Sequence, residues 1–288
     1  MMFDKPIRFV KDCSSQPENI RVFLKKQGFS TALIAKVKMG GCYINNTLVH
    51  MRATVNPSDV VEVMLPIEES KGIDPIDLPL DIVYEDEWMI AVNKPINMPV
   101  HPSLGNSLPT VANLLASYFN SPFVFRAVNR LDRDTSGIVL IAKNQLSAAI
   151  LSRSIKSGKI AKEYLAIVEG TPTQISGAVD APIERETPDG MRRIVREDGK
   201  SCLTQYELIK SFDNGNSLLK VIPITGRTHQ IRVHMKHIGH PLVNDFLYGE
   251  RAEGKTYSLH CSSLTLPHPI SGELIKITAP VPKGFYEQ

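Results

Sequence analysis

The spacing of apolar residues predicts two short helices near the N-terminus. The first has apolar side chains at helical spacing and ends before Gly28. The second can begin at a cap provided by Ser30 or Thr31, and it ends at Gly40 and Gly41. The apolar residues that define these helices are Ile20, Phe23, Leu24, Ile34 and Val37.

Apolar runs of strand length follow the helices. Asn45-Asn46 separates two such runs and can adopt the left-handed backbone of a tight hairpin turn. Val60, Val61 and Val63 indicate a further strand. Residues 1–66 are therefore expected to form one small domain. Residues 67–79 mix Pro, Gly and charge without periodicity, which is typical of a linker.

From residue 80 to residue 288, short β-branched runs alternate with polar turns. The clearest helical patterns cover 111–119 and 147–155, and a polar helix ends near Gly239. Strands outnumber helices and do not alternate regularly with them. This pattern predicts an α+β domain on a mixed, mainly antiparallel sheet. The expected strands are Ile82–Tyr84, Met89–Val92, Ile138–Ala142, Tyr164–Val168, Leu218–Ile222 and Leu274–Ile277.

Composition narrows the class of protein. A chain of 288 residues with 42% apolar content can bury an ordinary core. We expect a cytoplasmic protein that does not cross a membrane, because there is no signal-like opening segment and no apolar run of about 20 residues. The cysteines are scattered without a C-x-x-C pair, which argues against a disulfide framework or a thiolate zinc site. They are Cys13, Cys42, Cys202 and Cys261.

Charge is unevenly distributed. The net charge is only +3, but residues 1–66 hold 9 Lys and Arg against 5 Asp and Glu. A small basic domain beside a neutral large one suggests a contact surface for the phosphates of a nucleic acid. A solvated basic face with no partner explains the same charge equally well.

The segment NRLDRDTSG, residues 129–137, places Asp132 between Arg130 and Arg133 just before a buried strand. Arginine neighbours can keep a carboxylate ionised, which suits a nucleophile. A salt bridge without catalytic function is the commoner explanation for such a carboxylate. A structural turn explains the residues from Asp134 to Gly137.

A second polar segment, TGRTHQIRVH, covers residues 225–234. Arg227 follows Gly226 and can present a planar guanidinium to a carboxylate or phosphate. An ordinary surface helix is the alternative. We reject a metal site at His234, His237 and His240, because residues three apart drift around a helix and no H-E-x-x-H pattern is present.

Two shorter motifs are weaker. Lys162 and Tyr164 begin an apolar strand, where a tyrosine offers a flat face and a hydroxyl but is more often part of the core. Asn93-Lys94-Pro95 follows the strand after Tyr84, and a plain turn is the simplest interpretation of it.

Taken in order, these motifs resemble those of the RluA-type pseudouridine synthases, and the resemblance spans nearly the whole chain after the linker. Residues 1–66 resemble the alpha-L RNA-binding domain, with Asn46 and Ser58 at positions where glycine is usual. The motifs that carry the main resemblance are YED (84–86), NKP (93–95), RLDRDTSG (130–137), KEY (162–164), TGRTHQIRVH (225–234), and Leu259-His260 ahead of Pro267-His268-Pro269.

The resemblance implies that Asp132 is the essential aspartate and Arg227 its ion-pair partner. Tyr164 would pack on the target base, and Leu259 would line the same pocket. Asn129 stands where the family usually has His, and Asn244 where Gly is common. These departures affect a loop contact and a turn.

The implied reaction is isomerisation of uridine to pseudouridine in RNA, without a cofactor or a metal. The carboxylate could attack the sugar or remove a sugar proton, and the sequence does not choose between the two routes. The target uridine would be flipped out, with the backbone held by basic residues. Ribosomal RNA of the large subunit is the favoured substrate and transfer RNA the alternative. We expect a monomer without a protein partner. The basic candidates are Arg130, Arg133 and Lys162.

The sequence is also compatible with two other functions. A retaining glycosidase or nucleosidase would pair Asp132 with Asp134 or Glu163 and would release free uracil. A non-catalytic RNA-binding protein would keep the basic N-terminus and tolerate loss of Asp132.

Overall fold

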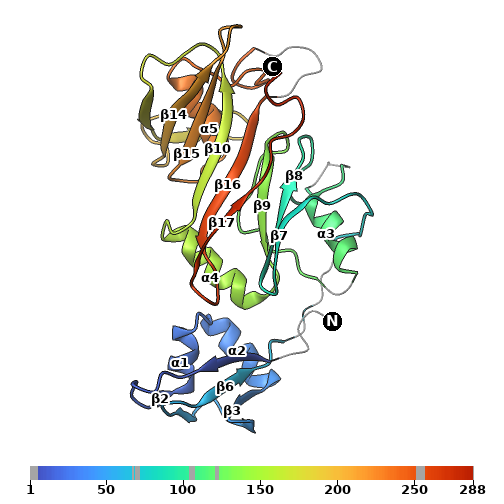
Figure 1. Cartoon of the computed structure of the whole chain (residues 1–288), viewed down its shortest axis with the longest axis vertical. Helices are drawn as coiled ribbons and strands as arrows, with labels where there is room; N and C mark the ends of the chain where they lie inside the picture. Colours follow the sequence, from blue (N-terminus) through green and yellow to red (C-terminus); the bar gives the residue numbers. More distant parts are fainter. Residues whose placement is uncertain are drawn as a thin grey trace.

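The computed structural model describes residues 6–66, 68, 72–103, 108–120, 123–250 and 257–287. A small N-terminal unit lies at one end of a larger unit built on a long twisted sheet (Figure 1). No helix within these residues is long and apolar enough to cross a bilayer. All four cysteines are free.

The N-terminal unit packs two helices against a four-stranded antiparallel sheet in the order β1-β6-β3-β4, and β2 pairs separately with β5. Both predicted helices are present, and Ser30 caps the second by accepting a hydrogen bond from the Leu33 amide. The β3–β4 turn has Asn45 and Asn46 at φ of 49° and 64°, the left-handed conformation expected for that pair. The elements are β1 (Ile7–Val10), β2 (Glu18–Asn19), α1 (Ile20–Lys26), α2 (Thr31–Gly40), β3 (Cys42–Ile44), β4 (Thr47–Leu48), β5 (Thr54–Val55) and β6 (Val60–Val63).

This unit rests on helix α4 (Gln145–Lys156) of the larger unit (Figure 1). Leu146 belongs to the apolar core of the N-terminal unit, and Ile150 packs against it. Arg153 donates a hydrogen bond of 2.7 Å to the carbonyl of Gly28. Gly28 has φ +101°, and a Cβ there would lie 2.6 Å from Ile150. Gly28 therefore both ends α1 and permits close approach of α4.

The larger unit contains a nine-stranded sheet in the order β11-β14-β15-β10-β16-β9-β8-β7, with β17 paired to β16. All neighbouring strands are antiparallel except β16 and β9. The predicted α+β class with a mixed, mainly antiparallel sheet is confirmed. The remaining elements of the sheet and its helices are β7 (Ile82–Glu85), β8 (Met89–Lys94), α3 (Val111–Phe119), β9 (Ser136–Ala142), β10 (Ala161–Val168), β11 (Ser176–Asp180), β14 (Leu203–Ser211), β15 (Ser217–Pro223), α5 (Gln230–His237), β16 (Leu259–Pro267) and β17 (Leu274–Thr278).

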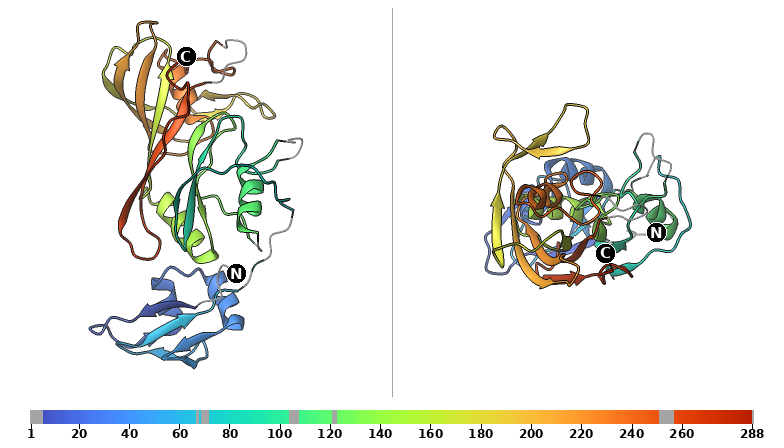
Figure 2. Two further views of the ribbon diagram at one scale, coloured as in Figure 1. Left: turned by 45° about the vertical axis from the view of Figure 1, so that its right-hand side comes forward. Right: turned by 90° about the horizontal axis from the view of Figure 1, so that it is seen from above.

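Four strands between residues 176 and 211 were not predicted. Exposed positions along β14 hold Gln205, Glu207 and Lys210, so the apolar signal of a strand is diluted there. Two of the four, β12 (Ile183–Arg185) and β13 (Arg193–Val195), form a separate hairpin that stands out from the body of the molecule (yellow, Figure 2).

The parallel contact between β16 and β9 fixes the loop that carries Asp132. Cys261 pairs with Gly137, which has φ +105°. A Cβ at Gly137 would lie only 2.3 Å from the Cys261 carbonyl oxygen, so a larger residue would separate the strands. Gly137, the last residue of the RLDRDTSG segment, therefore fixes the position of the Asp132 loop relative to β16.

Candidate active site

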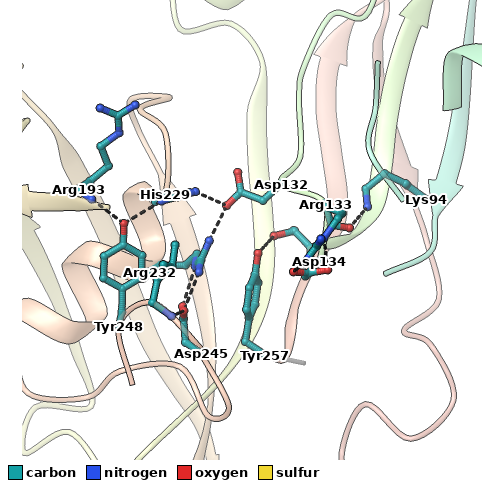
Figure 3. Close-up of polar contacts among 12 residues, drawn as sticks. Lys94, Asp132, Arg133, Asp134, Arg193, His229, Arg232, Asp245, Tyr248 and Tyr257 are labelled. Carbon is teal, nitrogen blue, oxygen red and sulfur yellow. Dashed lines mark hydrogen bonds and ion pairs between the residues drawn. The ribbon is translucent and has the colours of Figure 1, made fainter. Parts of the chain in front are cut away.

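Asp132 lies in the loop before β9 and faces the N-terminal end of α5 (Figure 3). Its Oδ2 atom is 3.3 Å from Nη1 of Arg232 and 3.7 Å from Nε2 of His229. Its other carboxylate oxygen, Oδ1, has no hydrogen-bonding partner within the described part of the chain. The side chain is 29% exposed. One oxygen is thus held by the protein while the other is available to a substrate.

Arg232 contacts the carboxylates of both Asp132 and Asp245. It makes a bidentate contact with Asp245, with Nε to Oδ2 at 2.7 Å and Nη2 to Oδ1 at 2.6 Å. Burial by itself lowers the pKa of Arg232, but the hydrogen bonds and charge of Asp245 outweigh it and raise the pKa. The guanidinium therefore stays charged and rigid, and its remaining Nη1 points at Asp132.

Aromatic rings surround the same guanidinium. Its central carbon lies 4.3 Å from the ring centroid of Tyr257, 5.0 Å from that of Tyr248 and 5.4 Å from that of Phe246. These rings exclude water and attract the cation through their faces. The Asp132–Arg232 contact therefore lies in surroundings that weaken screening by solvent.

The expected ion pair between Asp132 and Arg227 is not formed, and this expectation is corrected. Arg227 is exposed, and its Nε donates to the Ser201 carbonyl at 3.2 Å. The residue lies in the turn before α5, whereas Arg232 lies within the helix, on its buried side. The sequence offers two arginines five residues apart and does not indicate which one the helix turns inward.

Gln230 stabilises the turn that precedes α5 through its hydrogen bonds. Its Oε1 accepts hydrogen bonds from the Thr225 hydroxyl and the Arg227 amide, each at 2.9 Å. Its Nε2 donates to the Leu203 carbonyl and the Thr204 hydroxyl. Gln230 is buried, so it supports the turn rather than reaching toward a ligand.

Lys94 stabilises the loop of Asp132 by bonding to its backbone. Its ammonium donates to three backbone carbonyls at 2.8 Å, those of Pro95, Met98 and Arg133. Burial lowers its pKa to about 7, against the attraction of Asp134 and Asp132. The NKP motif therefore does more than make a plain turn, because its lysine ties two loops together.

Tyr164 and Lys162 lie on the same face of β10. Tyr164 is 7% exposed and belongs to the main core. Burial, followed by the neighbouring Cys261 and Asp132, raises its pKa well above the ordinary value. Burial lowers the pKa of Lys162, whose ammonium lies close to Gly226. Tyr164 thus lies near Asp132, and Lys162 lies near the turn before α5.

The other predicted site residues are more peripheral. Arg130 is exposed, and Arg133 makes a bidentate contact with Asp134 through two hydrogen bonds of 3.0 Å. Leu259 is buried and, with Ser136 and Tyr257, lines a pocket of about 60 Å³. That volume holds only a few water molecules. A role for Leu259 at the base stays a prediction.

His234 has a structural role. Its ring nitrogens are 2.8 Å from the Thr204 hydroxyl and 2.9 Å from the Ala181 carbonyl, so both are occupied. Within the described residues, no group of three or more His, Cys, Asp or Glu side chains is arranged to hold a metal ion.

Sequence reasoning did not single out four groups that complete the site: the Arg232 guanidinium, His229, Asp245 and Tyr257. Each of these groups can be recognised as part of the site only in the folded chain. There, residues far apart in the sequence lie in contact, as Asp132 and Arg232 do. Arg232 and His229 carried a usable signal, since both lie in the polar segment 225–234. Asp245 and Tyr257 carried none in isolation.

Residues 88–237 match the sequence model of a family described as RNA pseudouridylate synthase. That span contains Asp132, Tyr164 and Arg232. The chain belongs to the RNA pseudouridylate synthase family. It is therefore an isomerase, and the RluA-type relationship indicated by its motifs is confirmed.

Individual relatives agree with this family. The chain is 38% identical over 270 residues to the ribosomal large subunit pseudouridine synthase D of Haemophilus ducreyi, covering 87% of this chain and 81% of that protein. It is 35% identical over 273 residues to an uncharacterized RNA pseudouridine synthase, YjbO, of Bacillus subtilis, covering 92% and 96%.

One solved structure is also similar to this chain. The human RNA pseudouridylate synthase domain containing 1 superposes with a TM-score of 0.61 at 28% sequence identity, covering 74% of this chain and 86% of that one. The pseudouridine synthase fold thus extends over most of the present chain.

Proposed function

We propose that this pseudouridine synthase acts on uridines of large-subunit ribosomal RNA and that Asp132 is its catalytic carboxylate. The observation that carries the catalytic assignment is the asymmetry of Asp132, whose Oδ2 is held by Arg232 while Oδ1 has no partner among the described residues. The ribosomal substrate is supported by the similarity to synthases named for that RNA.

The reaction breaks the bond between ribose C1′ and uracil N1, turns the uracil, and joins C1′ to uracil C5. The hydrogen on C5 is lost as a proton and N1 gains one, so nothing is oxidised and water is not consumed. Oδ1 of Asp132 can begin this sequence by attacking C1′ or by removing the proton from C2′. Both routes need an ionised carboxylate, and Arg232 provides a permanent positive charge beside it.

Tyr164 is the aromatic residue proposed to contact the base. It belongs to β10 and lies near enough to Asp132 for their charges to interact. Because its pKa is raised, its phenol stays protonated at neutral pH and can donate a hydrogen bond to a uracil carbonyl. That contact would hold the detached uracil while it turns.

Exposed cations around the loop are proposed to hold the RNA backbone on either side of a flipped uridine. Arg130 and Arg227 are exposed, and Arg133 keeps half of its side chain accessible while paired with Asp134. The Lys162 ammonium lies against the turn before α5. Contacts of this kind fix the position of the RNA without reading its sequence.

A glycosidase reaction is less well supported. It would need a second carboxylate facing Asp132, but both oxygens of Asp134 are held by Arg133. Glu163 contacts Ser263 and Lys276 instead. Asp245 is fully buried behind Arg232. None of these three is placed to activate a water molecule for release of uracil.

The proposal is tested with RNA from a strain that lacks this gene, separated into large-subunit, small-subunit and transfer RNA. Each fraction is incubated with the wild type, with Asp132→Asn, or with Asp213→Asn, an exposed carboxylate between β14 and β15. Pseudouridines are then mapped chemically and free uracil is measured.

We expect the wild type and Asp213→Asn to modify one or a few uridines of large-subunit RNA, with no release of uracil. Asp132→Asn should modify none. Modification of transfer RNA alone would overturn the proposed substrate. Equal modification by Asp132→Asn would overturn the assignment of the carboxylate.

A further inference from the structure

His229 occupies an unusual position at the start of α5. It is the N-cap residue, yet its φ is +58°, and its side chain makes no capping hydrogen bond. A left-handed backbone at a residue other than glycine costs about 1–2 kcal/mol, and such strain is concentrated at functional sites. The conformation turns the imidazole away from the helix and toward Asp132 (Figure 3).

The hydrogen bonds of the Tyr248 hydroxyl favour one position for the hydrogen of this ring. The Tyr248 hydroxyl oxygen accepts a hydrogen bond of 2.9 Å from the Arg193 amide. The same hydroxyl lies 2.8 Å from Nδ1 of His229. Burial raises the pKa of Tyr248 to about 12, so the phenol keeps its proton. Because its oxygen already accepts from the Arg193 amide, we assign the phenol O–H as the hydrogen-bond donor to Nδ1.

The charge of the ring follows from its surroundings. Burial lowers the pKa of His229. Asp132 and Asp245 oppose this effect, while Arg232 and Arg193 act in the same direction as burial. The ring is therefore neutral at neutral pH, and because Nδ1 accepts from Tyr248, the single ring hydrogen is on Nε2. Nε2 is the nitrogen that faces Oδ2 of Asp132 at 3.7 Å.

We propose that His229 is a positioning residue for Asp132, and that its Nε2–H closes onto Oδ2 when RNA binds. Catalytic hydrogen bonds are often long in the free enzyme and shorten in the complex. Arg232 and His229 would then hold Oδ2 from two directions, which leaves Oδ1 directed at the ribose. The inference rests on the proposed role of Asp132.

The hydrogen-bond chain also connects this position to the projecting hairpin. The Arg193 amide belongs to β13, so the order runs from β13 through Tyr248 and His229 to Asp132 (Figure 3). A movement of the hairpin would therefore change the orientation of the imidazole. Arg232 is instead held by its bidentate hydrogen bonds to Asp245 and meets Tyr248 only through the face of the ring.

A matched pair of variants separates positioning from a backbone role. His229→Gln keeps an N–H donor near the place of Nε2, whereas His229→Asn is too short to reach Asp132. Asparagine tolerates a left-handed backbone better than glutamine does. A residue needed only for its backbone would thus be replaced better by Asn, and a donor to Asp132 better by Gln.

The measurements are the single-turnover rate with saturating enzyme and the dissociation constant of the RNA. We expect His229→Asn to lower the rate about 10- to 100-fold, the effect of losing a hydrogen bond to a charged group, with the dissociation constant unchanged. His229→Gln should retain a rate within about fivefold of the wild type. A rate for His229→Asn equal to or above that of His229→Gln would overturn the inference.

A second measurement does not depend on how the variants fold. Nitrogen-15 NMR of the wild-type imidazole should show hydrogen on Nε2 and none on Nδ1. Hydrogen on Nδ1 in the wild type would contradict the proposal. These outcomes are separable from failure of the proposed function, which the Asp132→Asn variant decides.

Discussion

The Lys94 side chain stabilises the loop that carries Asp132. It is unusual for a lysine because it is 1% exposed and its hydrogen bonds go to backbone carbonyls alone. The three carbonyls come from two loops, and one of them belongs to Arg133 beside the catalytic carboxylate. A shift in the protonation of Lys94 would therefore affect both stability and the position of Asp132.

The lowered pKa of Lys94 predicts how stability depends on pH. Above about pH 7 the folded protein releases a proton that the unfolded chain keeps until about pH 10.4. The unfolded state then binds more protons, so this residue makes stability rise with pH, by at most about 1.4 kcal/mol per unit. Lys94→Met removes the effect while also leaving the carbonyls unpaired.

The test compares thermal unfolding of the wild type and Lys94→Met between pH 6.5 and 9.5. The variant should be less stable throughout, and the difference in unfolding free energy should widen as the pH rises. A difference that stays constant or narrows would show that Lys94 remains charged over this range.

Three residues show what sequence comparison can and cannot predict at this scale. Asn46, Ser58 and Asn244 stand where glycine is usual in the families this chain resembles, and all three have positive φ, from 62° to 67°. The turns are therefore kept despite the substitutions. Asn129 replaces a usual His, and its amide bonds the Leu140 amide and the Ile138 carbonyl, which fixes the loop to β9.

Helix α5 is the element that assembles the site. It presents Arg232 to Asp132 and Asp245, while the turn before it directs Arg227 outward to the Ser201 carbonyl. The sequence predicted a polar helix that ends near Gly239, and the ordered motifs predicted the neighbourhood of Asp132. Which arginine faces inward depends on how α5 packs against distant strands, which no local pattern encodes.

A comparison of Arg232→Lys with Arg227→Lys tests this correction. Lysine lacks the planar guanidinium that contacts both oxygens of Asp245 while Nη1 reaches Asp132, so Arg232→Lys should lower the single-turnover rate by about 100-fold or more. Arg227→Lys keeps a positive charge in an exposed turn and should change the rate less than about threefold. Thermal unfolding of both variants identifies any loss that comes from misfolding. A larger loss for Arg227→Lys would restore the original assignment.

At the scale of the whole molecule, the N-terminal unit and the sheet are joined through α4 at Gly28 and Ile150. Sequence patterns separated the two parts, but the contact between them combines apolar packing of Leu146 with a close approach at Gly28, and neither could be predicted from local patterns. A fixed contact means that any RNA held by the basic N-terminal unit has a defined orientation relative to Asp132. Domain limits of 1–66 and 80–288 stay a prediction.

The basic N-terminal unit should contribute phosphate contacts. Lys25 is exposed on α1, and Lys25→Gln should weaken RNA binding and reduce the slope of log affinity against log salt by about one if one contact is lost. Lys210→Gln, an exposed lysine on β14, is the control and should leave the slope unchanged. Equal slopes for both variants and the wild type would exclude Lys25 from the RNA contact.

The central claim is that Oδ1 of Asp132 acts on the ribose of the target uridine. Its most direct test is the single-turnover rate of pseudouridine formation by Asp132→Asn, measured with saturating enzyme on an RNA fragment that contains the modified site. Asparagine keeps the shape of the side chain but removes the charge, so we predict a rate reduced by more than about 10⁴-fold, with RNA affinity and thermal stability close to those of the wild type. A variant that binds RNA normally and retains a tenth or more of the wild-type rate would contradict the account.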